Sequence, residues 1–267
     1  MMNKMLSFGL CLFAFVILWI LFFAFNAQQL SWDIGMEFRA PTWQIPGGYA
    51  QYGQPLAELI GTGGLMILAY AFTSTFVVSI VSCFYGFILA SKKENSLGFK
   101  FMYGFLDIWG SIPGPILAGM ILYAFGSSLL MLSLAFALAS FDNLARFSWS
   151  LAKKAFAEPH YHADMSLGFS NTRLFYKNFI FDWVGPASAK FCTLVSSYIF
   201  FGTAAVIIGI LDEQSFAWGA LVEQGRQYFD IAPHVIFWGW GLILLTTTSL
   251  GFISSGIQRL FDRKIIR

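Results

Sequence analysis

The chain has few charged residues and none of the motifs on which many soluble enzymes depend. Only 11% of its 267 residues are Asp, Glu, Lys or Arg, whereas soluble domains average about 25%. It contains no phosphate-binding Gly-x-x-x-x-Gly-Lys-Ser/Thr loop, no Gly-x-Ser-x-Gly and no His-Glu-x-x-His. The sequence therefore excludes ATP binding by such a loop and offers no catalytic constellation. We expect a protein that is not an enzyme, with no cofactor of its own and no nucleic-acid partner.

Cysteine is scarce as well, and its positions argue against disulfides. The three cysteines all fall within apolar runs, and no pair has the spacing of metal ligands: Cys11, Cys83 and Cys192. His160, His162 and Asp164 form a His-x-His-x-Asp cluster, but metal binding needs convergent geometry and usually a further ligand. We interpret these three residues as solvent-facing polar groups and expect no metal site.

Long apolar runs are what the chain has instead. Apolar residues make up 57% of it, and a helix needs about 20 of them to cross a membrane. Backbone groups in lipid must bond to one another, so each run is predicted to be helical. The sequence predicts an all-α integral membrane protein with about six transmembrane helices, forming one membrane domain over residues 1–267. The runs are residues 6–25, 60–90, 102–125, 128–140, 191–211 and 235–253.

The first run and the basic residues predict how the chain crosses the membrane. The run over 6–25 is longer than a signal-peptide core, so we expect a retained first helix. If the N-terminus is cytoplasmic, all of the 16 Lys and Arg except Arg39 and Arg226 lie on the cytoplasmic side or at its edge. Lys and Arg favour that side, so both termini are predicted to be cytoplasmic, with core helices over 60–256.

The segments between the runs differ in character. An outer loop is predicted over 26–58, where Pro and Gly argue against a long helix. A second, acidic outer loop over 212–234 is either a docking surface for a binding protein or an ordinary solvated loop. The longest cytoplasmic segment, 142–189, has apolar residues at helical spacing among charged ones, which predicts short amphipathic helices.

Within that segment a helix, a sharp elbow and a second helix are predicted. Gly168 lies between two apolar-periodic stretches and can end a helix in the left-handed conformation. The hydroxyl of Ser170 can cap a helix that starts near Asn171. From spacing alone, such a segment either docks on a partner protein or lies on the membrane surface.

This stretch resembles the cytoplasmic loop of ABC importer permeases, and in particular the C-type subunit of the dipeptide, oligopeptide and nickel importers. The stretch that starts at the elbow glycine, 168–180, follows the order of that family's loop. The family's Glu-Ala-Ala triplet falls on His162-Ala163-Asp164, so the chain resembles a divergent member. Further likenesses are Asp107-Ile108 with Ser111-Ile112-Pro113, Trp218-Gly219, Gly225-Arg226, Ala232-Pro233 and the stretch 256–262.

The resemblance implies a type I ABC importer permease fold whose cytoplasmic coupling helix docks on an ATPase. It assigns the apolar anchor to Phe169 and Leu174 and a basic rim to Arg173 and Lys177. The remaining coupling residues that it implies are Ala163, Asp164, Gly168 and Ser170. It also implies a bacterial cytoplasmic membrane location and half of a translocation pathway for peptides or related small solutes. The implied partners are a homologous second permease, two ABC ATPase subunits that bind ATP and Mg, an extracytoplasmic solute-binding protein and membrane lipid.

The third apolar run holds three candidate pathway or gating residues. Pro113 and Pro115 are predicted to bend its helix, either as a packing kink or as a bend that shapes a pathway. Asp107 is a functional candidate because ionisable residues within membrane helices are costly, although we expect it near the helix's cytoplasmic start.

Two other classes of membrane protein compete with the permease. A stand-alone secondary transporter or channel would predict inverted repeats and ion-pairing charges near mid-membrane, and neither is visible in the sequence. A membrane enzyme or assembly factor would predict clustered polar residues in the helices, and only Asp107 comes close.

Overall fold

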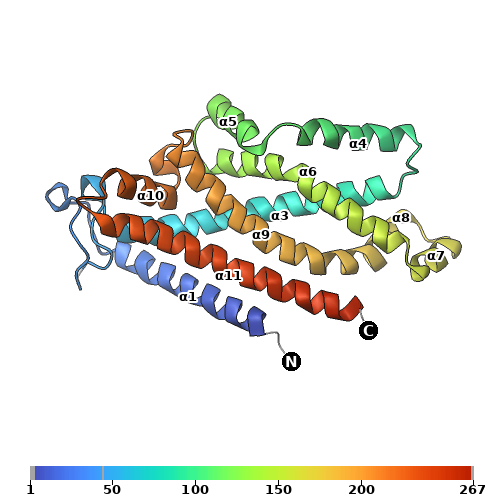
Figure 1. Ribbon diagram of the computed structural model, residues 1–267, viewed down its shortest axis with the longest axis horizontal. Coiled ribbons are helices and arrows are strands. Elements are labelled where there is room, and N and C mark those ends of the chain that lie inside the picture. The colour runs from blue at the N-terminus through green and yellow to red at the C-terminus, as the bar shows by residue number, and fades with distance from the viewer. Residues whose placement is uncertain (1–3, 44, 266–267) are drawn as a thin grey trace.

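The long helices lie side by side along one axis and form a single elongated bundle (Figure 1). The computed structural model describes residues 4–43 and 45–265. Within them, five helical segments are long and apolar enough to cross a membrane, or six if one bent pair counts as a span. The predicted all-α membrane architecture is confirmed. The long helices are α1 (Lys4–Ala27), α3 (Thr62–Ala90), α6 (Leu129–Phe156), α9 (Ile180–Ile207) and α11 (Pro233–Ile265).

Shorter elements gather at the two ends of the bundle, which we call the α10 end and the α7 end (Figure 1). The α10 end holds η1 (Ile34–Met36), η2 (Gln51–Gly53), α2 (Leu56–Ile60), η4 (Glu213–Ser215) and α10 (Ala217–Gln227). The α7 end holds α7 (Pro159–Ser166), α8 (Asn171–Leu174) and the π-helical turn η3 (Phe175–Phe179). The first described turn of α1 and the last of α11 both point towards the α7 end.

The third predicted span is broken into α4 (Leu97–Gly110) and α5 (Gly114–Phe125), which are bent by 80°. Pro113 precedes α5 and Pro115 lies in its first turn, where the missing N–H groups cost nothing but α4 cannot continue. The predicted bend is therefore confirmed. Because α4 starts earlier than expected, Asp107 lies about 15 Å along it at 1.5 Å per residue. The expectation that Asp107 lies near the helix start was wrong.

The predicted segment 142–189 includes the last part of α6, which continues to residue 156, and the first part of α9, which begins at residue 180. Charged residues in this part of α6 are paired on the helix surface. Arg146 Nε lies 2.8 Å from Asp142 Oδ1, one helical turn away. Its guanidinium also lies over the ring of Tyr103, 5.0 Å from the centroid. Such pairing lets α6 keep its charges while it continues as a helix.

The predicted outer loop 212–234 also contains more structure than expected. Helix α10 packs against α9 and α11, and both Trp218 and Leu221 are fully buried. Sequence reasoning missed α10 because the helix is short and its apolar residues are mixed with Glu and Gln. The 26–58 segment, as predicted, contains no long helix among its described residues.

Small and hydroxyl-bearing residues bring the long helices together. Ser74 Oγ of α3 donates to the carbonyl oxygen of Ser133 in α6 at 2.8 Å. Ser254 Oγ of α11 donates to the carbonyl oxygen of Ala189 in α9, also at 2.8 Å. A Cβ on Gly86 would lie 2.5 Å from the backbone nitrogen of Trp149. Close approach and interhelical hydrogen bonds are the typical means of helix association in lipid.

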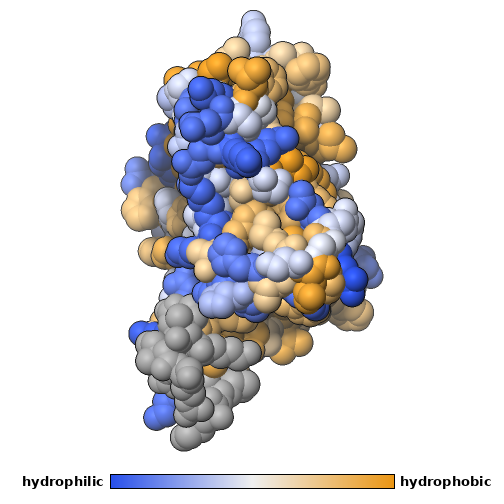
Figure 2. Space-filling model, turned by 90° about the vertical axis from the view of Figure 1, so that its right-hand side faces the viewer, coloured by the Kyte–Doolittle hydropathy of each residue, from blue (hydrophilic) through white to orange (hydrophobic). Residues whose placement is uncertain are grey.

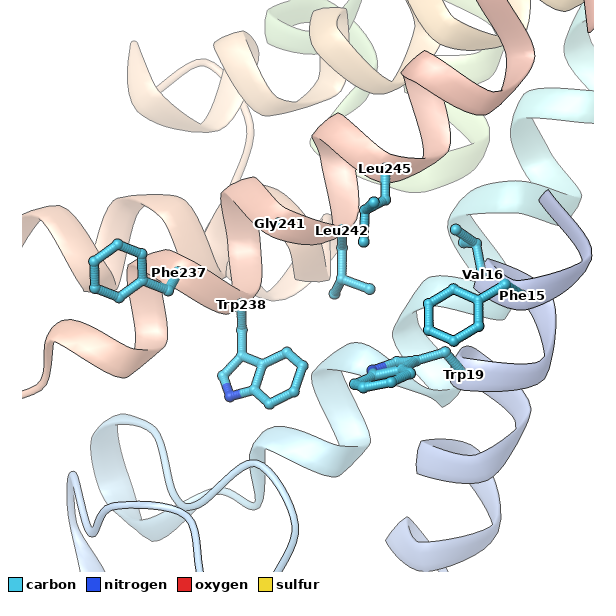
Figure 3. A pocket seen from close by; sticks show the side chains of 8 residues that line it. All are labelled: Phe15, Val16, Trp19, Phe237, Trp238, Gly241, Leu242 and Leu245. Carbon is cyan, nitrogen blue, oxygen red and sulfur yellow. The ribbon is translucent and has the colours of Figure 1, made fainter. Parts of the chain in front are cut away.

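An apolar hollow of about 160 Å³ lies between α1 and α11. Trp19 and Trp238 point towards each other across it, with ring centroids 6.1 Å apart (Figure 3). Its walls are apolar side chains of two membrane-spanning helices, so it belongs to the apolar surface of the bundle.

The contact at Gly86 generates a stability prediction. Gly86→Ala places a methyl group against the backbone of α6, and overpacking of this kind costs about 1–3 kcal/mol. We expect a lower thermal unfolding midpoint in mild detergent. Gly251→Ala in α11 is the matched control, because its Cβ would meet no atom within 4 Å, and its midpoint should not fall. Equal midpoints for both variants would contradict the assigned α3–α6 contact.

Candidate functional site: the elbow at the α7 end

Residues 157–179, which we call the elbow segment, connect α6 to α9 and contain the predicted helix, elbow and helix. Glu158 precedes α7, and Pro159 occupies its first turn, a position that suits proline. After α7 the chain turns at Gly168, whose φ is +80°. Glycine adopts this left-handed conformation without the penalty of a Cβ. The predicted elbow is confirmed at this residue.

The second helix also starts where the sequence predicts. Ser170 Oγ accepts a hydrogen bond of 3.4 Å from the backbone nitrogen of Arg173, and α8 begins at Asn171. From there the chain stays helical through α8, η3 and α9. The elbow therefore connects directly to a membrane-spanning helix, with no flexible linker after residue 170.

Aromatic rings attach the elbow segment to the bundle. Phe87 of α3 lies 4.9 Å from the ring of Phe175 and 5.1 Å from that of Phe179. Phe156 at the end of α6 lies 5.0 Å from the ring of Tyr161 in α7. These five residues pack in one buried or partly buried cluster, which we call the aromatic clamp. Aromatic pairs contribute about 0.5–1.5 kcal/mol each beyond their buried area, so the clamp fixes α7 and η3 to α3 and α6.

Polar contacts also hold the two halves of the elbow segment together. Asp164 accepts hydrogen bonds from Asn178 Nδ2 at 2.7 Å and from Lys177 Nζ at 3.2 Å. These two partners, Asn178 first, lower the pKa of Asp164 below its usual value. A lowered carboxyl pKa means that the contacts persist at neutral pH and are lost only as the pH falls into the acid range. Arg173 and Lys177 also lie over the ring of Phe169, 3.8 and 4.7 Å from its centroid.

The structure changes the anchor that the resemblance implied. Leu174 is 1% exposed and lies in the cluster beneath the elbow, so it holds the segment in place and does not form part of the outer surface. Phe169 is half-buried under two cations. The large apolar side chains of the elbow segment that are exposed are Leu167, at 73%, Tyr176, at 58%, and Met165, at 48%. Sequence reasoning missed Leu167, although an apolar residue just before a helix-ending glycine was the available signal.

The same segment exposes polar side chains as well. Ser170, Arg173, Lys177 and both histidines of α7 are exposed, together with Ala163. Figure 2 views the molecule from the α7 end and shows hydrophilic and hydrophobic side chains side by side on this face. An apolar centre with a basic and polar rim is the arrangement of a protein-docking surface.

Asp107 lies away from the elbow, in a three-residue ionic group between α4 and α6. Arg146 Nη2 lies 2.7 Å from Asp107 Oδ1, while Arg146 Nε contacts Asp142. The group attaches α4 to α6 just before the break at Pro113. A role of Asp107, Pro113 and Pro115 in a pathway or gate stays a prediction.

Comparison with known proteins finds several that are similar to this chain. No family model matches it. It is 24% identical to the oligopeptide transport system permease protein OppC of Haemophilus influenzae, over 98% of this chain and 85% of that protein. It is 24% identical to OppC of Escherichia coli K12 over 61% of this chain and 54% of that protein. It is 23% identical to the glutathione transport system permease protein GsiD of Salmonella typhi, over 62% and 55%. The last two alignments span about half of each relative.

The fold and these relatives first define a class: the chain is a multi-pass membrane protein homologous to permease components of ABC transporters, and its relatives are transport subunits, not enzymes. Within that class it is a divergent homologue of the oligopeptide and glutathione permeases, which belong to the dipeptide/oligopeptide family of ABC importer permeases.

The exposure of Leu167 and the burial of Leu174 generate a labelling prediction. With the three native cysteines replaced by alanine, Leu167→Cys should react rapidly with a water-soluble maleimide, because its side chain lies in the open. Leu174→Cys should react at least about tenfold more slowly, because local opening must precede reaction. Labelling rates from mass spectrometry test this. Equal rates, or faster reaction at position 174, would contradict the described elbow.

Proposed function

We propose that the chain is one of two homologous permease subunits of an ABC importer and forms half of its translocation pathway. Two partner ATPase subunits bind and hydrolyse ATP with Mg, and an extracytoplasmic binding protein delivers the solute. The observation that carries this proposal is the elbow segment, which displays an apolar residue within a basic rim and is clamped to membrane-spanning helices. The relatives support the same assignment.

The elbow segment suits a groove on an ATPase. Leu167 and Met165 supply apolar surface that can be buried, which is the main favourable term in association. Arg173 and Lys177 supply positive charge beside it, and an acidic groove rim would complement it. Coupling residues in this proposal are those of the elbow, Ala163 to Lys177, with Leu167 in place of Leu174 as the anchor.

In this proposal the aromatic clamp passes the motion of the ATPase subunits to the membrane-spanning helices. When the ATPases close on ATP, their surfaces move, and a docked segment must move with them. Phe87 and Phe156 connect the segment to α3 and α6, while η3 continues directly into α9. A displacement of the elbow is thereby passed to three membrane-spanning helices as one unit.

The proposed permease function also implies a membrane orientation and a class of solute. The α7 end is cytoplasmic in this proposal, with both termini on that side of a bacterial cytoplasmic membrane, in line with the distribution of Lys and Arg. The relatives are named for oligopeptides and glutathione, so the solute proposed for this chain is a peptide or a related small molecule.

The experiment is a pull-down of the tagged chain from its native membranes in mild detergent, followed by mass spectrometry. We expect a second permease and a phosphate-loop ATPase to co-purify. Leu167→Asp places a charge at the apolar anchor and should remove most of the ATPase while the second permease is retained. Ile231→Asp is the matched control, since Ile231 is also exposed, at 69%, but lies at the α10 end, and it should retain both partners.

Two outcomes would overturn the proposal. Recovery of the unmodified chain alone, stable and monodisperse, would favour a stand-alone transporter or channel. Undiminished ATPase recovery with Leu167→Asp, and also with Gly168→Pro and Phe169→Asp, would show that the elbow is not the docking surface.

A further inference from the structure

Two stripes of different chemistry run along α4, the first half of the bent pair. In a helix of 3.6 residues per turn, residues three, four and seven apart share a face. One face of α4 carries exposed apolar side chains, which we call the apolar stripe: Leu97, Phe101, Phe105 and Ile108. The next face carries charged, hydroxyl-bearing or small residues, which we call the polar stripe: Lys100, Gly104, Asp107 and Ser111. A membrane helix with two outer faces of opposite chemistry has two different surroundings.

The polar stripe lies far from both ends of the bundle. Asp107 Oδ1 is 2.7 Å from Arg146 Nη2, and Arg146 Nε is 2.8 Å from Asp142 Oδ1. Asp142 lies at the middle of α6, about 20 Å from either end at 1.5 Å per residue. Helix α6 is long and apolar enough to span a membrane, so this ionic group lies near the bilayer centre.

The charge of the ionic group makes its outer side unsuitable for lipid. With both carboxylates ionised, the two acids and one guanidinium carry one net negative charge. The Asp107 side chain is 57% exposed, which places it on the outside of this subunit. Ionisable residues at membrane depth are costly against hydrocarbon and almost always face the bundle interior or a water-filled cavity. We therefore exclude lipid as the cover of the polar stripe.

The same polar surface continues onto α6. Asn143 and Ser150 are exposed and lie three residues before and four residues after Arg146, so the three side chains share a face of that helix. Because Arg146 bonds to Asp107, this face adjoins the polar stripe of α4, which runs beside α6 (Figure 1). A Cβ on Gly104 would meet no described atom within 4 Å. Space is therefore open above the polar stripe.

We propose that the polar stripe and the adjoining face of α6 form this subunit's wall of a water-filled pathway, while the apolar stripe faces lipid. The carboxylate of Asp107 can accept more hydrogen bonds than the one that Arg146 donates. Water supplies those donors and solvates the net charge, whereas a packed helix would need matched partner groups at each position. The inference rests on the proposed permease function and names the surface of this chain along which the solute passes.

The test is cysteine labelling in native membrane vesicles, with the three native cysteines replaced by alanine. Gly104→Cys and Ser111→Cys place a thiol on the polar stripe. Ile108→Cys is the matched control on the apolar stripe, because Ile108 lies between them along α4 and is itself exposed, at 73%. The probe is a positively charged methanethiosulfonate present on both sides of the membrane. Positions 104 and 111 should react at least about tenfold faster than position 108, because the reactive thiolate forms in water and not in lipid.

Equal rates at the three positions, or faster reaction at position 108, would overturn the inference. Slow reaction at all three would overturn it as well, and would show that protein, such as a helix of the second permease, covers the polar stripe. Rates are measured by mass spectrometry on chains recovered with their partners, so an unassembled variant does not contribute. Co-purification of the ATPase tests the permease function separately. Failure of labelling alone therefore leaves that function standing.

Discussion

The aromatic clamp is the interaction on which the proposed function depends. An elbow docked on a moving partner transmits force only if it cannot slide over the bundle. Phe87 contacts Phe175 and Phe179, and Phe156 contacts Tyr161, so rings from α3, α6, α7 and η3 close one cluster. Protein interiors packed in this way are stiff. The same apolar stacking that stabilises the ends of these helices makes the elbow a rigid extension of them.

The two ends of the bundle differ in what they offer a partner. At the α7 end, cations cover the elbow and the apolar Leu167 is exposed, which suits a protein surface. At the α10 end, Glu213 and Gln224 border a large cavity with negative charge. Between them the helices pack through hydroxyl groups and glycine, as at Ser74 and Gly86. The proposed permease function needs such a difference between the two ends, because the partner that supplies energy and the solute would meet the bundle at opposite ends.

Sequence reasoning predicted most features that depend on composition or on single backbone positions. The apolar runs predicted the long helices because lipid leaves them no alternative. Gly168 and Ser170 predicted the elbow because left-handed backbone and helix capping are local properties. Sequence reasoning failed where contacts between distant parts of the chain determine which side chains are buried. Leu174 and Leu167 have the same chemistry, and only the clamp determines which is buried. The ion pair of Arg146 with Asp107 could not be predicted either, because the two residues lie on different helices, 39 positions apart in the sequence.

The most direct test of the account is hydrogen–deuterium exchange of the elbow segment in the purified full chain, comparing the unmodified protein with Phe87→Ala. Phe76→Ala is the control, because Phe76 is an exposed phenylalanine of the same helix. A clamped elbow predicts slow exchange over residues 171–179 that becomes markedly faster in Phe87→Ala and is unchanged in Phe76→Ala, since protected amides exchange through local opening. Fast exchange in the unmodified protein, or equal exchange in both variants, would contradict the claim that the aromatic clamp holds the elbow rigid.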